Sequence, residues 1–171
     1  MSVEDKLQKC LKEGEKNSER HKGLRKISPN REIAKGHLSK AIKNFSAITD
    51  FHDSKHSDWS ASAAFYALYH GLLSILALEG FESRNQSCTF AIVEEFIQKG
   101  KMKELTVKDL KEIFDNEVKD KLEHSHKILD IREEMQYSTK TDLAEQEFQH
   151  LKQRTKELFD KIRREIERKL Y

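Results

Sequence analysis

The chain has 171 residues, enough for one domain with a substantial hydrophobic core. Charged residues make up 36% of the sequence, with six Gly and one Pro, which favours long solvated helices over a β-sheet protein. The net charge is only +2, which excludes a polycation that binds nucleic acid through overall charge.

The cysteines and the apolar segments predict a cytoplasmic protein. Cys10 and Cys88 form no CxxC pair, so we expect two free thiols in a reducing compartment. The longest apolar run, residues 61–78, is interrupted by polar residues, and the N-terminus lacks a signal-peptide pattern. We therefore expect no membrane association.

The first half of the chain predicts three helices. A weak amphipathic helix covers 3–27 and frays beyond Gly14. A second helix should start with Ser28 as N-cap and Pro29 at the first helical position. The spacing of its apolar residues predicts that it ends near Phe51.

The third helix, 59–79, is apolar or small on nearly every side and should form the centre of the molecule. After a loop, a fourth helix covers 87–98. A long helical stripe then covers 110–135 and is interrupted at 137–141. Thr141 or Asp142 caps the last helix. The fold class is therefore all-α, a single domain over 1–171 with five to six mostly antiparallel helices.

Two segments resemble the landmarks of the HEPN family of helical-bundle proteins. In residues 62–96, SAAFYALYHGLLSILALEGFESRNQSCTFAIVEEF, the matching positions are Ala64, Tyr66, Ala67, Tyr69, His70 and Gly80. In residues 129–137, LDIREEMQY, they are Arg132 and Tyr137. The resemblance makes 56–171 a HEPN-like core and 1–55 an N-terminal helical extension.

The resemblance implies a helical bundle that forms a homodimer. Many family members are ribonucleases with an Arg followed by four to six residues and a His. Others, in toxin–antitoxin pairs, are partners of minimal nucleotidyltransferases, which modify a tyrosine near that motif. Here Tyr137, Ser138 and Thr139 occupy the positions of the catalytic histidine after Arg132. A phenol and two hydroxyls cannot exchange protons near neutral pH as imidazole does, so we expect no nuclease activity of the family type.

Four residues are candidate binding residues, each with a structural alternative. Arg132 is a cation for phosphate or a salt-bridged arginine on a buried stripe. Tyr137 is a modification target or ligand contact, or a ring packed at the end of the bundle. His70 is a substitute acid or base, or a core residue. Tyr66 is a base-stacking platform or, with Phe65 and Tyr69, part of the core.

Other candidate sites are weaker. His124 and His126 lie about 200° apart around a helix and cannot chelate one metal together. We find no phosphate-binding loop or HExxH motif, and expect no metal and no cofactor. The cleanest basic cluster, Lys22, Arg25, Lys26 and Arg31, is the first choice for a phosphate-rich partner, with a plain solvated surface as the alternative.

The leading hypothesis is a HEPN-like binding or regulatory module for a nucleotide, RNA or a nucleotidyltransferase partner, with no catalytic residue assigned. The first alternative is a metal-independent ribonuclease toxin with a non-standard base, His70 or a histidine of the second subunit. The second alternative is a helical scaffold or interaction protein.

Overall fold

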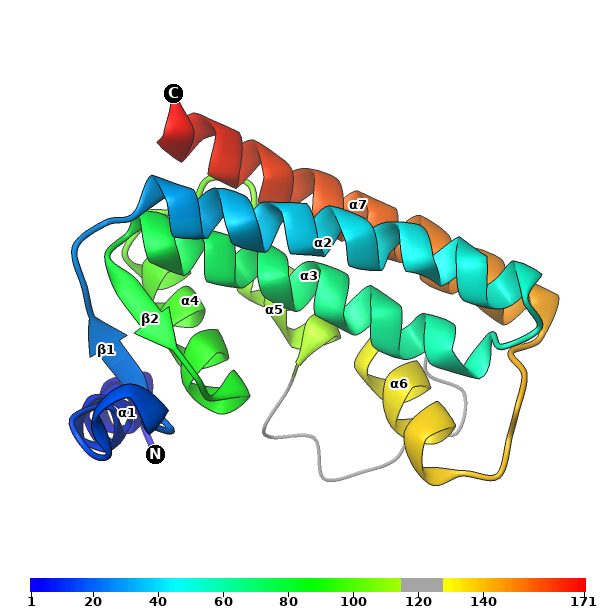
Figure 1. Ribbon diagram of the computed structural model, residues 1–171, viewed down its shortest axis with the longest axis horizontal. Helices are drawn as coiled ribbons and strands as arrows, with labels where there is room; N and C mark the ends of the chain where they lie inside the picture. The colour runs from blue at the N-terminus through cyan, green and yellow to red at the C-terminus, as the bar shows by residue number, and fades with distance from the viewer. Residues whose placement is uncertain (115–127) are drawn as a thin grey trace.

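The computed structural model describes residues 1–114 and 128–171. Over these ranges it contains seven α-helices and one two-stranded sheet (Figure 1), which confirms the all-α helical bundle. The elements are α1 (Val3–Gly14), a 3-10 turn (Ser18–Arg20), β1 (Leu24–Lys26), α2 (Arg31–Asp53), α3 (Asp58–Leu78), β2 (Phe81–Ser83), α4 (Gln86–Gln98), α5 (Val107–Ile113), α6 (Ile128–Tyr137) and α7 (Glu145–Leu170).

Helix α3 lies at the centre, as its composition predicts, and packs against α2, α4, α6 and α7. The pairing of α2 with α3 is fixed by two buried hydroxyls. Ser60 Oγ donates to the carbonyl of Ile48, and Ser74 Oγ donates to the carbonyl of Ala34, both at 2.8 Å. Among the described helices α3 alone is long and apolar enough to cross a membrane, and 78% of its most apolar stretch is buried inside the bundle.

The N-terminal segment departs from the predicted helix over 3–27. Helix α1 ends at Gly14, and β1 pairs antiparallel with β2, Leu24 facing Ser83. Two glycines allow the chain to turn back on α1, because a Cβ on Gly23 would stand 2.5 Å from the backbone nitrogen of Gly14. The low strand propensity of the sequence therefore did not exclude a short strand pair that tertiary packing supports.

The prediction of two free thiols is wrong, because Cys10 and Cys88 form a disulfide between α1 and α4. Seventy-eight residues separate the two cysteines, and both are buried. No local spacing motif indicates such a pair, since α1 and α4 become neighbours only in the fold. Free thiols were one reason to expect a cytoplasmic protein, and the disulfide removes that reason.

The second helix begins later than Ser28 and Pro29 predict. The backbone N–H groups of Ile27 and Asn30 donate to the carbonyls of Gly80 and Ala77 at 2.9 Å, which ties this stretch to the end of α3. The side chain of Asn30 then caps α2 by accepting from the N–H of Ile33. The N-cap of α2 is therefore Asn30, the residue after Pro29.

The predicted helix over 110–135 is not continuous. Helix α5 ends at Ile113, and Phe114 is extended, with φ −155° and ψ 127°. Its ring stacks on Phe90, with the ring centroids 4.5 Å apart, so a tertiary contact favours the extended residue over another helical turn. His124 and His126 lie outside the described residues.

The last helix begins at Glu145 rather than after a Thr141 or Asp142 cap. The backbone N–H of Leu143 donates to Ser57 Oγ at 2.8 Å, and the Leu143 side chain is buried. This contact holds the connector against the start of α3. Helix α7 can therefore begin only beyond it.

Candidate functional site

Tyr66 and His70 lie one helical turn apart on α3, and both reach the surface. Tyr66 is 38% exposed and His70 is half-buried. Phe65 and Tyr69, by contrast, are buried. The expectation that all three aromatic residues belong to the core is right for Phe65 and Tyr69 and wrong for Tyr66. The Tyr66 and His70 ring centroids are 6.5 Å apart.

Arg132 extends from α6 to the same part of α3. Its Cζ lies 3.9 Å from the centroid of the buried Phe65 ring and 5.8 Å from that of Tyr66. Its Nε is buried without a hydrogen-bond partner, and no described carboxylate forms an ion pair with it. Among the described residues, the guanidinium is therefore held by cation–π contacts.

The fourth member of the site is His37 of α2. Its Nδ1 lies 3.1 Å from His70 Nδ1, so one ring donates a hydrogen bond to the other, and the ring centroids are 5.4 Å apart. We call His37, Tyr66, His70 and Arg132 the α3 cluster. It joins three helices, with Tyr66 in contact with both His70 and Arg132.

The two imidazoles of the α3 cluster favour their neutral forms. Burial lowers the pKa of His70 to about 4, with smaller effects of the same sign from His37 and Lys40. Burial and Lys40 also lower the pKa of His37. At neutral pH the positive charge of the cluster therefore resides on Arg132, and His70 has no proton to give as a general acid.

The lowered pKa of His70 predicts a loss of stability in acid. Between pH ~6.5 and pH ~4, His70 is protonated in the unfolded chain but neutral in the folded chain. The free energy of unfolding is therefore not reduced by His70 above pH ~6.5, and it falls as the pH drops toward ~4. We expect a loss of about 1–2 kcal/mol after allowance for solvent screening. Urea unfolding at several pH values would measure it.

A His70→Gln variant should show a shallower decline of stability between these pH values than the wild type. His52 acts with the opposite sign, since hydrogen bonds to Glu145 and Asp53 raise its pKa. Its contribution is present at low pH and lost as pH rises through that raised pKa. Equal acid slopes for the wild type and the His70→Gln variant would contradict the assignment.

Tyr137 does not join the other three predicted residues in the described structure. It is the last residue of α6 and is 76% exposed. It lies five positions after Arg132 on the helix, which places it about 140° further round the axis. Ser138 and Thr139 are exposed beyond the helix end. No imidazole stands in the motif positions that follow Arg132.

Sequence reasoning missed His37, although a signal for it exists. Helices α2 and α3 are antiparallel neighbours joined by a short connector, so residues at similar distances from that connector lie opposite each other. His37 lies 16 positions before the end of α2 and His70 lies 12 positions after the start of α3, so this relation brings them only to within about one helical turn of each other. The apolar periodicity alone gave no reason to select His37.

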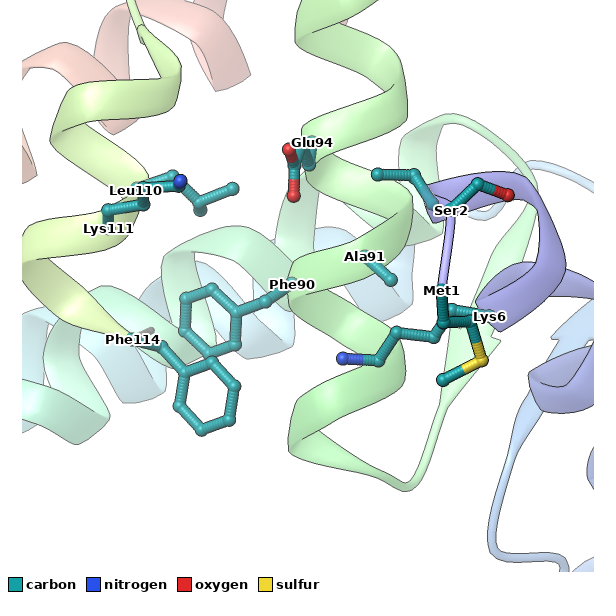
Figure 2. Close-up of a pocket in the computed structure, with 10 residues that line it drawn as sticks. Met1, Ser2, Lys6, Phe90, Ala91, Glu94, Leu110, Lys111 and Phe114 are labelled. Atoms are coloured by element: carbon teal, nitrogen blue, oxygen red, sulfur yellow. The ribbon is translucent and has the colours of Figure 1, made fainter. Parts of the chain in front are cut away.

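A separate hollow of about 300 Å³ lies between α1, α4 and α5. Figure 2 shows the stacked rings of Phe90 and Phe114 on one side, with Met1 and Lys6 of the α1 end on the other. None of the predicted site residues lines it. Phe114 is the last described residue before 115–127, and we assign the hollow no ligand.

The basic cluster near β1 is less available than its sequence indicates. Arg25 Nε donates to the carbonyl of Gly14 at 2.5 Å, so this side chain serves the packing of α1 on β1. Lys22, Lys26 and Arg31 are exposed. The structure therefore favours the α3 cluster over this basic cluster as the candidate site, because it combines a fixed cation with an exposed ring.

Comparisons with protein-family models, curated proteins and solved structures found no match. The resemblance to the HEPN family therefore rests on the sequence landmarks alone.

Proposed function

We propose that this chain is a HEPN-like binding module for a nucleotide or single-stranded RNA, with the α3 cluster as its contact surface and without nuclease activity. The observation that supports this most is the Arg132 guanidinium, held over Phe65 beside the exposed Tyr66 ring without a described carboxylate partner.

The chemistry of the cluster suits a phosphate next to a base. A guanidinium that pairs with no carboxylate of the described residues can form charge-assisted hydrogen bonds to phosphate oxygens. An exposed aromatic ring offers a stacking surface to any base, which is worth about 1–3 kcal/mol. With Arg132 and Tyr66 in contact, one nucleotide could use both, its phosphate on the guanidinium and its base on the ring.

The absence of nuclease activity follows from proton chemistry. Metal-independent cleavage of RNA needs one group to take a proton and another to return one near neutral pH. The lowered pKa of His70 keeps it unprotonated there, and Tyr137 stands where the motif histidine would be. The α3 cluster can therefore bind a phosphodiester without an evident acid to break it.

Binding of a fluorescent oligouridine, followed by anisotropy, tests the proposal. We expect salt-sensitive binding that Arg132→Gln or Tyr66→Ala weakens by about tenfold or more, since each removes a contact worth ~1–3 kcal/mol. Matched controls are Arg163→Gln on α7 and Tyr171→Ala at the exposed C-terminus, which should bind like the wild type. Failure of the wild type to bind, or equal binding by all variants, would contradict the proposal.

The ribonuclease alternative is supported by the two neighbouring imidazoles of His37 and His70. The same oligouridine decides between the two functions, because gel analysis after incubation would reveal any cleavage. Cleavage that His70→Gln abolishes would favour the ribonuclease and overturn the binding-module proposal. Intact RNA with retained binding supports the module.

The HEPN resemblance also makes Tyr137 a proposed target of a nucleotidyltransferase partner. Its exposure on the end of α6 leaves the hydroxyl accessible to another protein. This role is independent of the α3 cluster, since no described contact joins Tyr137 to it.

A further inference from the structure

The imidazole rings of His37 and His70 form a hydrogen-bonded pair, which the proposed nucleotide binding does not use. The two Nδ1 atoms lie 3.1 Å apart on two helices whose backbones are fixed on either side by the Ser60 and Ser74 hydroxyls. Both rings are half-buried and retain access to solvent. We propose that His37 and His70 form a two-histidine site for a divalent transition cation of the zinc, nickel and copper class.

The ligand chemistry agrees with this class of cation. Neutral imidazole is the form that binds metals, and it suits zinc, copper and nickel. In the hydrogen-bonded pair one Nδ1 already offers a lone pair, and the other holds the shared proton. If that ring moves its proton to its own Nε2, both Nδ1 atoms can ligate with no net gain or loss of protons.

The distance between the rings also fits two ligands of one metal ion. With metal–nitrogen bonds of about 2.05 Å, two nitrogens lie ~2.9 Å apart at a right angle and ~3.3 Å apart in a tetrahedral site. The observed separation of 3.1 Å falls between these values. In the hydrogen-bonded pair the rings lie nearly in line, with centroids 5.4 Å apart, so each ring must turn to aim its lone pair at the cation.

The site provides two protein ligands and leaves the other positions to water. Among the described residues no cluster of three or more His, Cys, Asp or Glu side chains could hold a metal. The positive charge of Lys40, which helps to lower the pKa of both rings, also opposes a bound cation. We therefore expect weaker binding than at a four-ligand structural zinc site, with exchangeable positions open to solvent.

Calorimetric titration of the metal-free full chain with Zn²⁺ and with Ni²⁺ at neutral pH tests the site. We expect a binding event of one equivalent, and a loss of at least about tenfold in its affinity in His37→Gln and in His70→Gln, because each variant removes one of two ligands. His56→Gln, which changes an exposed histidine in the connector between α2 and α3, should keep that event.

Imidazole nitrogen NMR provides a readout that separates ligation from a change in folding. In the folded wild type, Zn²⁺ should shift two Nδ1 resonances that disappear with the His37→Gln and His70→Gln substitutions. Circular dichroism would establish that each variant is folded. The proposal is overturned if neither cation binds, if both variants bind like the wild type, or if the shifted resonances belong to other histidines. This result is independent of RNA binding, which can succeed or fail on its own.

Discussion

Reduction of the Cys10–Cys88 disulfide should lower the free energy of unfolding by roughly 4 kcal/mol, the largest effect that we expect from a single covalent change. The disulfide closes a long loop, with its cysteines 78 residues apart, and in the chain-entropy account a longer loop restricts the unfolded state more strongly. It also joins α1 directly to α4. Loss of the bond should therefore loosen α1 and β1 first.

Urea unfolding followed by far-UV circular dichroism, with and without reductant, measures this effect. The Cys10→Ser, Cys88→Ser double variant should match the reduced wild type and should not respond to reductant. Hydrogen exchange would show whether protection is lost first in α1. Equal unfolding midpoints for the oxidised and reduced wild type would contradict the prediction.

Replacement of Glu165 by Ala should cost about 3 kcal/mol or more. This carboxylate is fully buried on α7, and it accepts hydrogen bonds from the backbone N–H groups of Lys103 and Glu104. It is also paired with Arg168. Removal of the side chain leaves two backbone donors in the connector from α4 to α5, and the Arg168 guanidinium on α7, without their acceptor.

Chemical denaturation of Glu165→Ala, Glu165→Gln and Glu167→Ala would test this role. Glu165→Gln keeps one oxygen for the backbone donors but loses the ion pair, so we expect a smaller loss than for Ala. Glu167 lies on the same helix, is exposed and pairs with Arg163 at 3.8 Å, so its replacement should change stability by less than about 0.5 kcal/mol. Similar losses for Glu165→Ala and Glu167→Ala would contradict the assigned role.

The helices with a strong periodic pattern could be predicted, and the boundaries set by tertiary contacts could not. Apolar residues all round the third segment predicted a central helix within one residue of the observed bounds of α3. The break at Phe114 depends on Phe90, and the late start of α7 depends on Ser57. Each partner is distant in sequence, so no local pattern contains the information.

In the candidate site too, residues with a local sequence signal could be predicted, and residues brought in by tertiary contacts could not. Tyr66, His70 and Arg132 were selected from the sequence, and the structure places them near one another. His37 was missed because its role arises from the pairing of α2 with α3. The disulfide was missed for the same reason. The partners of Arg132 among the described residues are the faces of aromatic rings on another helix, which no pattern in its own helix indicates.

Photo-crosslinking of a 4-thiouridine oligonucleotide to the full chain, with mass spectrometry of the linked peptides, tests the central claim most directly. The α3 cluster predicts adducts on the peptide around Tyr66 and on the α6 peptide that contains Arg132, and the Arg132→Gln substitution should reduce both. Adducts confined to the exposed basic residues 22–31, or yields that are insensitive to Arg132, would contradict the claim that this cluster is the binding surface.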